Sequence, residues 1–224
     1  MRKFVPAIFG FALFLSAGTL FAQINMSAGI TAGGSFFNVG ASSVADYSYK
    51  TGINVGGVFN LDVSKYMSLD ANPEFTMRGY DSRGTKYSVV DTTAASVTNN
   101  LAYIALPIHV RLKYPVSSAC NAFVLTGPDL GLLVSSKLDS SGSGFSSSTS
   151  VKNSFNTLDF GWDFGFGAEY SISQFTPFIE VAYYLDISDI NKSPNFYTGS
   201  GNDLDIVHHS FGCEAKVGIR MAIK

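Results

Sequence analysis

Charged residues and cysteines are scarce in this chain of 224 residues. Asp, Glu, Lys and Arg make up 14% of it and leave a net charge of −2, so no large basic field is available to attract nucleic acid. The two cysteines provide no Cys/His zinc spacing, and the sequence has no nucleophile elbow and no glycine-rich phosphate loop before a helix. We therefore expect no cofactor, no metal site and no nucleic-acid partner.

Long apolar runs are missing beyond the N-terminus, where a positive start precedes the apolar stretch Phe4–Leu20. This order, with the small Ala22 at the end, is typical of a secretory signal peptide. We predict a cleaved signal over residues 1–22 and one domain over residues 23–224. A membrane anchor helix is the alternative for the first segment, although the stretch is short for a span, and no later run approaches the ~20 apolar residues that a membrane helix needs.

Apolar and polar residues instead alternate over several segments. From 159 to 172, every even position is apolar and every odd position is acidic, Gly or Ser. Because successive side chains of a strand point to opposite faces, such a segment has one apolar and one polar face. Eight strands are predicted, at about 24–37, 51–63, 67–80, 101–114, 122–134 (the least regular, with Phe123, Leu125 and Leu133 on the inner face), 159–172, a seventh that contains 179–187, and 207–224.

The connections between these strands alternate in length. Short ones at 64–66, 115–121 and 173–174 separate long polar ones at 40–50, 81–100, 135–156 and 188–206. Outer-membrane barrels have short periplasmic turns, long outer loops and an even strand number. The sequence therefore predicts an all-β, eight-stranded antiparallel up-and-down transmembrane β-barrel, exported to the outer membrane, surrounded by its lipid and with both termini in the periplasm. A lipocalin-like soluble barrel, apolar inside, is the alternative.

Two sets of residues favour the membrane barrel. Aromatic side chains near strand ends predict interfacial girdles: Tyr66, Tyr80, Tyr103, Tyr114, Trp162, Tyr170 and Tyr183. The polar face carries Gly, Ser and charges of both signs, as a narrow lumen with paired charges requires. The predicted luminal charge network comprises Glu74, Arg78, Arg111, Lys113, Asp163, Glu169, Glu180, Glu214, Lys216 and Arg220.

Two pairings can be predicted from the same topology. Glu180 and Arg220 lie at similar heights on neighbouring strands, and we expect them to form an ion pair. Cys120 lies in a short turn and Cys213 lies well up the last strand on the outer face, so we expect no disulfide between them.

Four short motifs lie on the predicted strands: Leu101–Ile108, Thr126–Gly131, Asp159–Gly161 and Pro177–Glu180. With these motifs the chain resembles the PorT-like family of small outer-membrane β-barrel proteins, over essentially the whole mature chain. The resemblance implies an eight-stranded barrel and an outer-membrane location. Some members of that family are linked to protein secretion and others are called porins.

Chemistry-bearing residues gather at one place, where Asp203, Asp205, His208 and His209 lie at the entry to the last strand. An Asp–His pair can position a general base or bind a metal, and a polar loop with two rim histidines is the simpler interpretation.

The leading functional hypothesis is therefore a non-enzymatic structural or interaction barrel whose loops at 81–100 and 135–156 contact protein partners. The alternatives are a porin-like small-solute channel and a rim enzyme. Eight strands enclose a space that side chains nearly fill, which argues against the channel.

Overall fold

The computed structural model describes residues 25–41, 46–83, 96–142, 145–190 and 208–223. Within these ranges, no helix is long and apolar enough to cross a membrane. The strands form one antiparallel sheet. The elements are β1 (Asn25–Ala41), β2 (Asp46–Ser64), β3 (Met67–Ala71), β4 (Glu74–Arg83), β5 (Ser96–Pro115), β6 (Cys120–Gly142), β7 (Phe145–Ser150), the 3-10 helix η1 (Lys152–Ser154), β8 (Leu158–Tyr170), β9 (Phe175–Asp186) and β10 (His208–Ile223).

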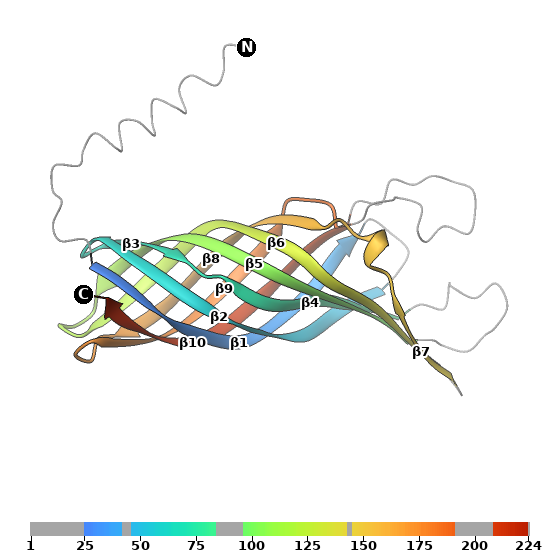
Figure 1. Cartoon of the computed structure of the whole chain (residues 1–224), viewed down its shortest axis with the longest axis horizontal. Helices are drawn as coiled ribbons and strands as arrows, with labels where there is room; N and C mark the ends of the chain where they lie inside the picture. The colour runs from blue at the N-terminus through green and yellow to red at the C-terminus, as the bar shows by residue number, and fades with distance from the viewer. Residues whose placement is uncertain (1–24, 42–45, 84–95, 143–144, 191–207, 224) are drawn as a thin grey trace, which may run out of the picture.

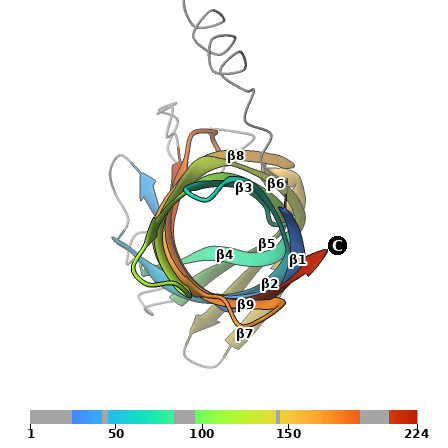
Figure 2. The ribbon, with the colours of Figure 1, turned by 90° about the vertical axis from the view of Figure 1, so that its left-hand side faces the viewer.

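The sheet closes into a ring with eight strand positions (Figure 2). The first and last strands, β1 and β10, pair from Met26 opposite Ile223 to Ala41 opposite His208. Since β3 and β4 together occupy one position and β7 pairs only with β6 among the described strands, ten strands make an eight-stranded barrel. The predicted fold class is confirmed.

The third predicted strand, 67–80, is divided into β3 and β4 at Asn72 and Pro73. Proline has no backbone N–H to donate to a strand ladder, so it interrupts regular pairing. Pairing continues across the break, because the Gly57 N–H donates to the Pro73 carbonyl at 2.9 Å and the Asn72 N–H donates to the Pro107 carbonyl at 3.0 Å. The position in the ring is therefore kept.

The predicted long loops are shorter than expected, because several strands extend beyond the ring (Figure 1). In the predicted loop 135–156, β6 continues to Gly142 and forms a hairpin with β7, which η1 follows. In the predicted loop 81–100, β4 and β5 pair from Arg83 opposite Ser96, and only residues 84–95 lie outside the described chain. Both loop assignments are corrected.

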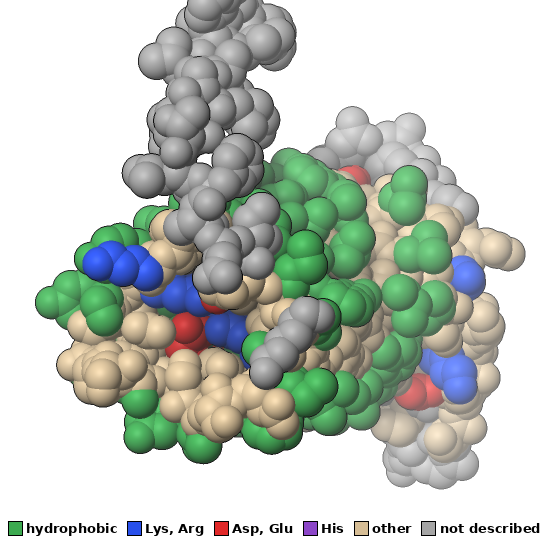
Figure 3. All heavy atoms as spheres, turned by 60° about the vertical axis from the view of Figure 1, so that its left-hand side comes forward, with side chains coloured by type: hydrophobic (Ala, Val, Ile, Leu, Met, Phe, Trp, Pro, Cys, Tyr) green, Lys and Arg blue, Asp and Glu red, His purple; other side chains and the backbone are tan. Residues whose placement is uncertain are grey.

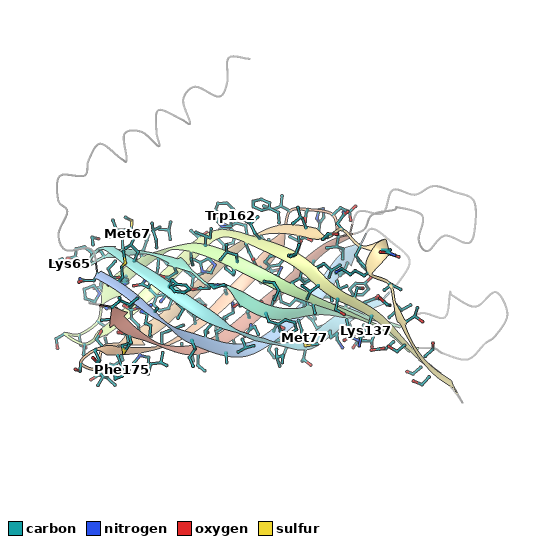
Figure 4. All side chains as sticks on the ribbon, in the orientation of Figure 1. Lys65, Met67, Met77, Lys137, Trp162 and Phe175 are labelled. Atoms are coloured by element: carbon teal, nitrogen blue, oxygen red, sulfur yellow. The ribbon has the colours of Figure 1, made fainter. Side chains whose placement is uncertain are left out.

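Three tight turns lie at one end of the barrel, which we call the short-turn end. They connect β2 to β3, β5 to β6 and β8 to β9, and Figure 4 places Lys65 and Phe175 at this end. Ser173 adopts a positive φ of 56° in the last of them, as a tight hairpin turn requires. The C-terminal end of β10 lies at the same end, and the β6–β7 hairpin projects from the opposite one (Figure 1).

The outer face of the barrel is apolar. Ile30, Phe166 and Ile53 are 69%, 63% and 57% exposed, and apolar side chains cover the sides in Figure 3, while the visible acidic and basic side chains lie in or around the mouth that faces the viewer and near the far end. This inside-out distribution excludes the lipocalin-like alternative and suits a barrel surrounded by lipid. Cys213 is exposed on the outer face, and both cysteines are free.

Candidate functional site: the filled lumen

The ten charged side chains that the sequence assigns to a luminal network all lie on the inner face and are all buried. Strand pleating explains this placement, since every second residue of a strand points to the lumen and each of these ten residues occupies such a position. The buried set also contains Asp70, Asp129, Asp159 and Asp186, which the predicted network omitted, and His109, which the sequence places in the lumen beside Arg111 and Lys113. The alternation was sufficient to predict that Asp70 and Asp186 point inward, because an even number of residues separates them from Glu74 and Glu180 respectively.

Arg111 is the centre of the layer nearest the short-turn end, and its side chain is completely buried. Its Nη2 lies 2.5 Å from Asp70 Oδ2 and 3.0 Å from Glu180 Oε2, and its Nη1 lies 3.6 Å from Glu169 Oε2. The guanidinium also lies 3.9 Å from the ring centroid of Phe123. One cation therefore forms ion pairs with acids from three different strands and packs on an aromatic ring.

The other cations of this layer converge on Glu169. Lys113 Nζ lies 3.4 Å from Glu169 and 2.5 Å from Asp62, and Arg220 forms an ion pair with Glu169. The predicted Glu180–Arg220 pair is therefore wrong. In the β9–β10 register Glu180 lies opposite Lys216 and Arg220 lies opposite Thr176, so Glu180 reaches across the lumen to Arg111 instead.

A second layer lies in the middle of the lumen. Lys216 Nζ lies 2.8 Å from Glu74 and 2.6 Å from Glu214, and the Thr76 hydroxyl donates to Glu214 at 3.1 Å. On the other side, His109 Nε2 lies 2.9 Å from Asp163 Oδ2. His109 is thus a member of the network, as a buried imidazole beside a carboxylate.

A third layer, toward the long-loop end, is built around Arg78. Its guanidinium pairs with Asp129 and donates to Asp159 Oδ2 at 3.0 Å. It also lies 4.1 Å from the ring centroid of Tyr184, and a β-carbon at Gly161 would fall on that same ring. Glycine at 161 therefore makes room for an aromatic side chain that fills the lumen.

An apolar cluster lies beyond Arg78 at the mouth of the long-loop end. It consists of Val39, Tyr80, Leu101, Tyr103, Leu133, Phe155 and Ile190, with Val151 packed against it. Tyr80 and Tyr103 are 3% and 2% exposed, so their assignment to an outward-facing aromatic girdle is wrong. The alternation itself indicates this inward direction, since Tyr80 lies two residues after Arg78 on the same strand and therefore points to the same face. Burial among apolar side chains in the mouth outweighs the preference of tyrosine for the membrane interface.

The remaining predicted girdle residues point outward. Tyr66, Tyr114 and Tyr170 are 51%, 73% and 50% exposed near the short turns. Tyr183 is 38% exposed, and the half-buried Trp162 donates its indole N–H to the Thr126 hydroxyl at 2.8 Å. An indole with a paired N–H and an otherwise apolar surface suits a membrane interface.

The predicted rim group can be followed only in part. Asp203, Asp205 and the side chain of His208 lie outside the described residues. His209 is exposed, and its Nδ1 lies 2.9 Å from the backbone carbonyl of Ser188, so the described part of the rim places no carboxylate against this imidazole. In the same part of the chain, no group of three or more His, Cys, Asp or Glu residues could hold a metal ion.

Comparisons with known proteins agree with this architecture. A family model described as an outer membrane protein beta-barrel domain matches residues 20–192. No curated protein matches the chain.

Several solved structures are similar in fold at low sequence identity. Neisserial surface protein A is 11% identical, with 87% of this chain and 96% of that chain covered and a TM-score of 0.44. The attachment invasion locus protein Ail of Yersinia pestis is 12% identical, with 87% and 98% covered and a TM-score of 0.39. The outer membrane protease OmpT of Escherichia coli is 10% identical, with 92% and 100% covered and a TM-score of 0.48.

Proposed function

The chain belongs to the outer membrane protein beta-barrel domain family, and we propose that it serves in the outer membrane as a closed, non-enzymatic barrel that acts through its projecting outer surface. The family and the fold place the barrel in membrane lipid, and the filled lumen is the observation that supports the rest. We further propose that residues 1–22 are a cleaved export signal, that both termini face the periplasm and that the chain is related to the PorT-like group.

We infer that the lumen of the described structure offers a solute no continuous path, because packed side chains cross it at several heights. Three layers of ion pairs around Arg111, Lys216 and Arg78 cross it, and the apolar cluster at the outer mouth lies beyond them. Moving a hydrated ion past this cluster would require stripping its water against apolar side chains. The geometry therefore favours a closed barrel over the porin-like alternative.

The mature chain, 23–224, purified from outer membranes and inserted into a planar bilayer, is expected to show no conductance steps. Its mass reports whether cleavage follows Ala22, and heat-modifiable gel mobility shows that it is folded. A conducting barrel added to the same bilayer is the positive control. Reproducible steps from the folded chain would overturn the closed-barrel proposal and favour a channel.

The contact surface that we propose is the strand extension at the long-loop end. Here β4, β5, β6 and β7 pair beyond the ring, with Lys137 opposite Ser150 and Asp139 opposite Ser148. Among the described strands, β7 pairs on one edge only, and its sequence FSSSTS has no charge and no proline to block further pairing. An extended segment of a partner could pair with this edge through backbone hydrogen bonds.

A photo-crosslinking amino acid at Ser148, which is exposed on β7, is expected to give a discrete higher-mass product in intact outer membranes. The same amino acid at Phe166, which is 63% exposed on the lipid-facing surface, is the matched control and should give none. Equal labelling from both positions, or no product from Ser148, would contradict a partner contact at β7.

A further inference from the structure

One hydroxyl at the outer mouth contacts two carboxyl groups. Ser188 Oγ lies 2.9 Å from Asp159 Oδ1 and 2.9 Å from Asp186 Oδ1. It also accepts a hydrogen bond from the Phe160 backbone N–H at 3.0 Å. We call this arrangement of Asp159, Ser188 and Asp186 the Ser188 bridge.

The Ser188 hydroxyl can donate to only one of the two carboxyl oxygens that it contacts in the Ser188 bridge. A serine hydroxyl has one proton to donate and two lone pairs that accept. The Phe160 N–H occupies one lone pair, so the two carboxyl contacts must use the proton and the remaining lone pair. One of the two carboxyl groups must therefore supply a proton of its own.

The partners of the two carboxyl groups decide which one carries that proton. Asp159 Oδ2 accepts from the Arg78 guanidinium at 3.0 Å and from the Tyr184 hydroxyl at 2.8 Å, so a cation compensates its charge. Among the described residues, Asp186 accepts from neutral backbone groups, the N–H of Ser188 at 2.9 Å and that of Ser210 at 3.3 Å, and forms no ion pair with a Lys or Arg side chain. The proton therefore belongs on Asp186, which donates it to Ser188 while Ser188 donates to Asp159.

The surrounding charges favour the same assignment. Among the described residues, the titratable groups that interact with Asp186 are Asp159 from β8, Tyr103 from β5 and Tyr184 from β9. Across the described lumen, nine buried carboxyl groups face five buried Lys and Arg side chains and one histidine. This acid surplus is too large for every carboxyl group to be charged, since unpaired buried charges are costly.

The Ser188 bridge also holds the segment that covers the mouth. The N–H of Ile187 donates to the Phe160 carbonyl at 2.9 Å, and the N–H of Asn156 donates to the Ile190 carbonyl at 2.8 Å. Ile190 and Phe155, which are 2% and 1% exposed, then complete the apolar cluster. Residues 187–190 are thus held at one end by the Ser188 bridge. At the other end they are held by the contacts of Ile190 with residues 155–156.

From this geometry we infer that the outer mouth is a proton-dependent closure, in which Asp186 holds a proton and ties residues 187–190 across the barrel. Loss of the proton leaves two carboxylates competing for one hydroxyl proton and repelling each other. Because the closed mouth contains the proton and the open one releases it, the closed state is favoured at low pH and is lost as the pH rises. The inference is independent of the proposed partner contact at β7.

Hydrogen exchange of the full chain in detergent micelles, followed between about pH 5 and pH 9 and corrected for intrinsic rates, tests the inference. In the wild type, the amides of Asn156 and Ile187, which donate to backbone carbonyls across the mouth, are expected to exchange about tenfold faster at the alkaline end, since a hydrogen bond to a charged group contributes at this level. Asp186→Asn keeps a donor toward Ser188 and should remove the pH dependence. Ser188→Ala should exchange fast at all pH values.

Asp62→Asn is the matched control, because it removes a carboxyl group at the opposite end of the lumen, and it should keep the wild-type pH dependence. Unchanged protection across this pH range in the wild type, or the same pH dependence in Asp186→Asn, would overturn the inference. If Asp186→Asn does not fold, the carboxyl carbon-13 resonance of Asp186 in the wild type decides the matter. A protonated signal near neutral pH is expected, and a fully ionised one would refute the closure.

Discussion

Replacing Arg111 by methionine is expected to lower the unfolding free energy of the barrel by about 3–5 kcal/mol, the range for breaking a buried ion pair by removing one partner. Arg111 is completely buried and contacts Asp70, Glu180 and Glu169. Methionine fills a similar volume beside Phe123 but leaves these carboxylates without their common cation. The loss of unfolding free energy therefore measures the effect of removing the guanidinium charge, since the packing around position 111 is largely kept.

Urea unfolding of the refolded chain in lipid vesicles, followed by gel mobility and tryptophan fluorescence, measures this change as a lower midpoint at similar slope. Lys65→Met is the control, because Lys65 is exposed in a tight turn and its Nζ lies over the Tyr66 ring, at 4.7 Å from the centroid. It should shift the midpoint little. An Arg111→Met barrel as stable as the wild type would show that the luminal ion pairs do not stabilise the fold.

Replacing Phe166 by arginine is expected to cost about 2–4 kcal/mol, the effect of arginine on the lipid face near the bilayer midplane. Phe166 is 63% exposed in the middle of β8, where it lies opposite Val124 and Val181. The same substitution at Tyr114, which is 73% exposed at the short-turn end, should cost only about 0–1 kcal/mol, because charges are tolerated at the interface.

Unfolding in vesicles measures both variants, and the comparison in detergent micelles shows whether the difference depends on the bilayer. Because both positions accept arginine without a steric clash inside the protein, the contrast isolates depth in the membrane. Equal losses at Phe166 and Tyr114 would mean that the apolar surface does not lie across a bilayer in the orientation that the girdle residues define.

Local patterns were sufficient for much of the fold and for most of the luminal site. The alternation over 159–172 and 67–80 placed Asp163, Glu169, Glu74 and Arg78 on the inner face, because side-chain direction in a strand depends only on position in the chain. The same rule applied to Tyr80 and Tyr103 indicates that they point inward. The girdle prediction was wrong for these two residues because it relied on the presence of aromatic residues near strand ends and not on which face their position in the strand points to.

The length of the strands beyond the membrane was not predictable from composition. Residues 135–150 are rich in Ser and Gly, which usually indicates a loop, but here the segment pairs with β5 and with itself as the β6–β7 hairpin. Strand formation in such a segment depends on backbone hydrogen bonds to neighbours far along the chain. Residue type alone contains little of that information.

The sequence by itself determined the eight-stranded barrel, its apolar exterior and the set of charged side chains that enter the lumen, because alternation and turn spacing are local properties. Only the tertiary structure decided which charges form pairs and which side chains close the mouth. Glu180, for example, pairs with Arg111 and not with Arg220. Those contacts depend on the stagger between strands and on the width of the ring. Both are set when β1 pairs with β10, and closure of the ring brings together residues that no local pattern relates.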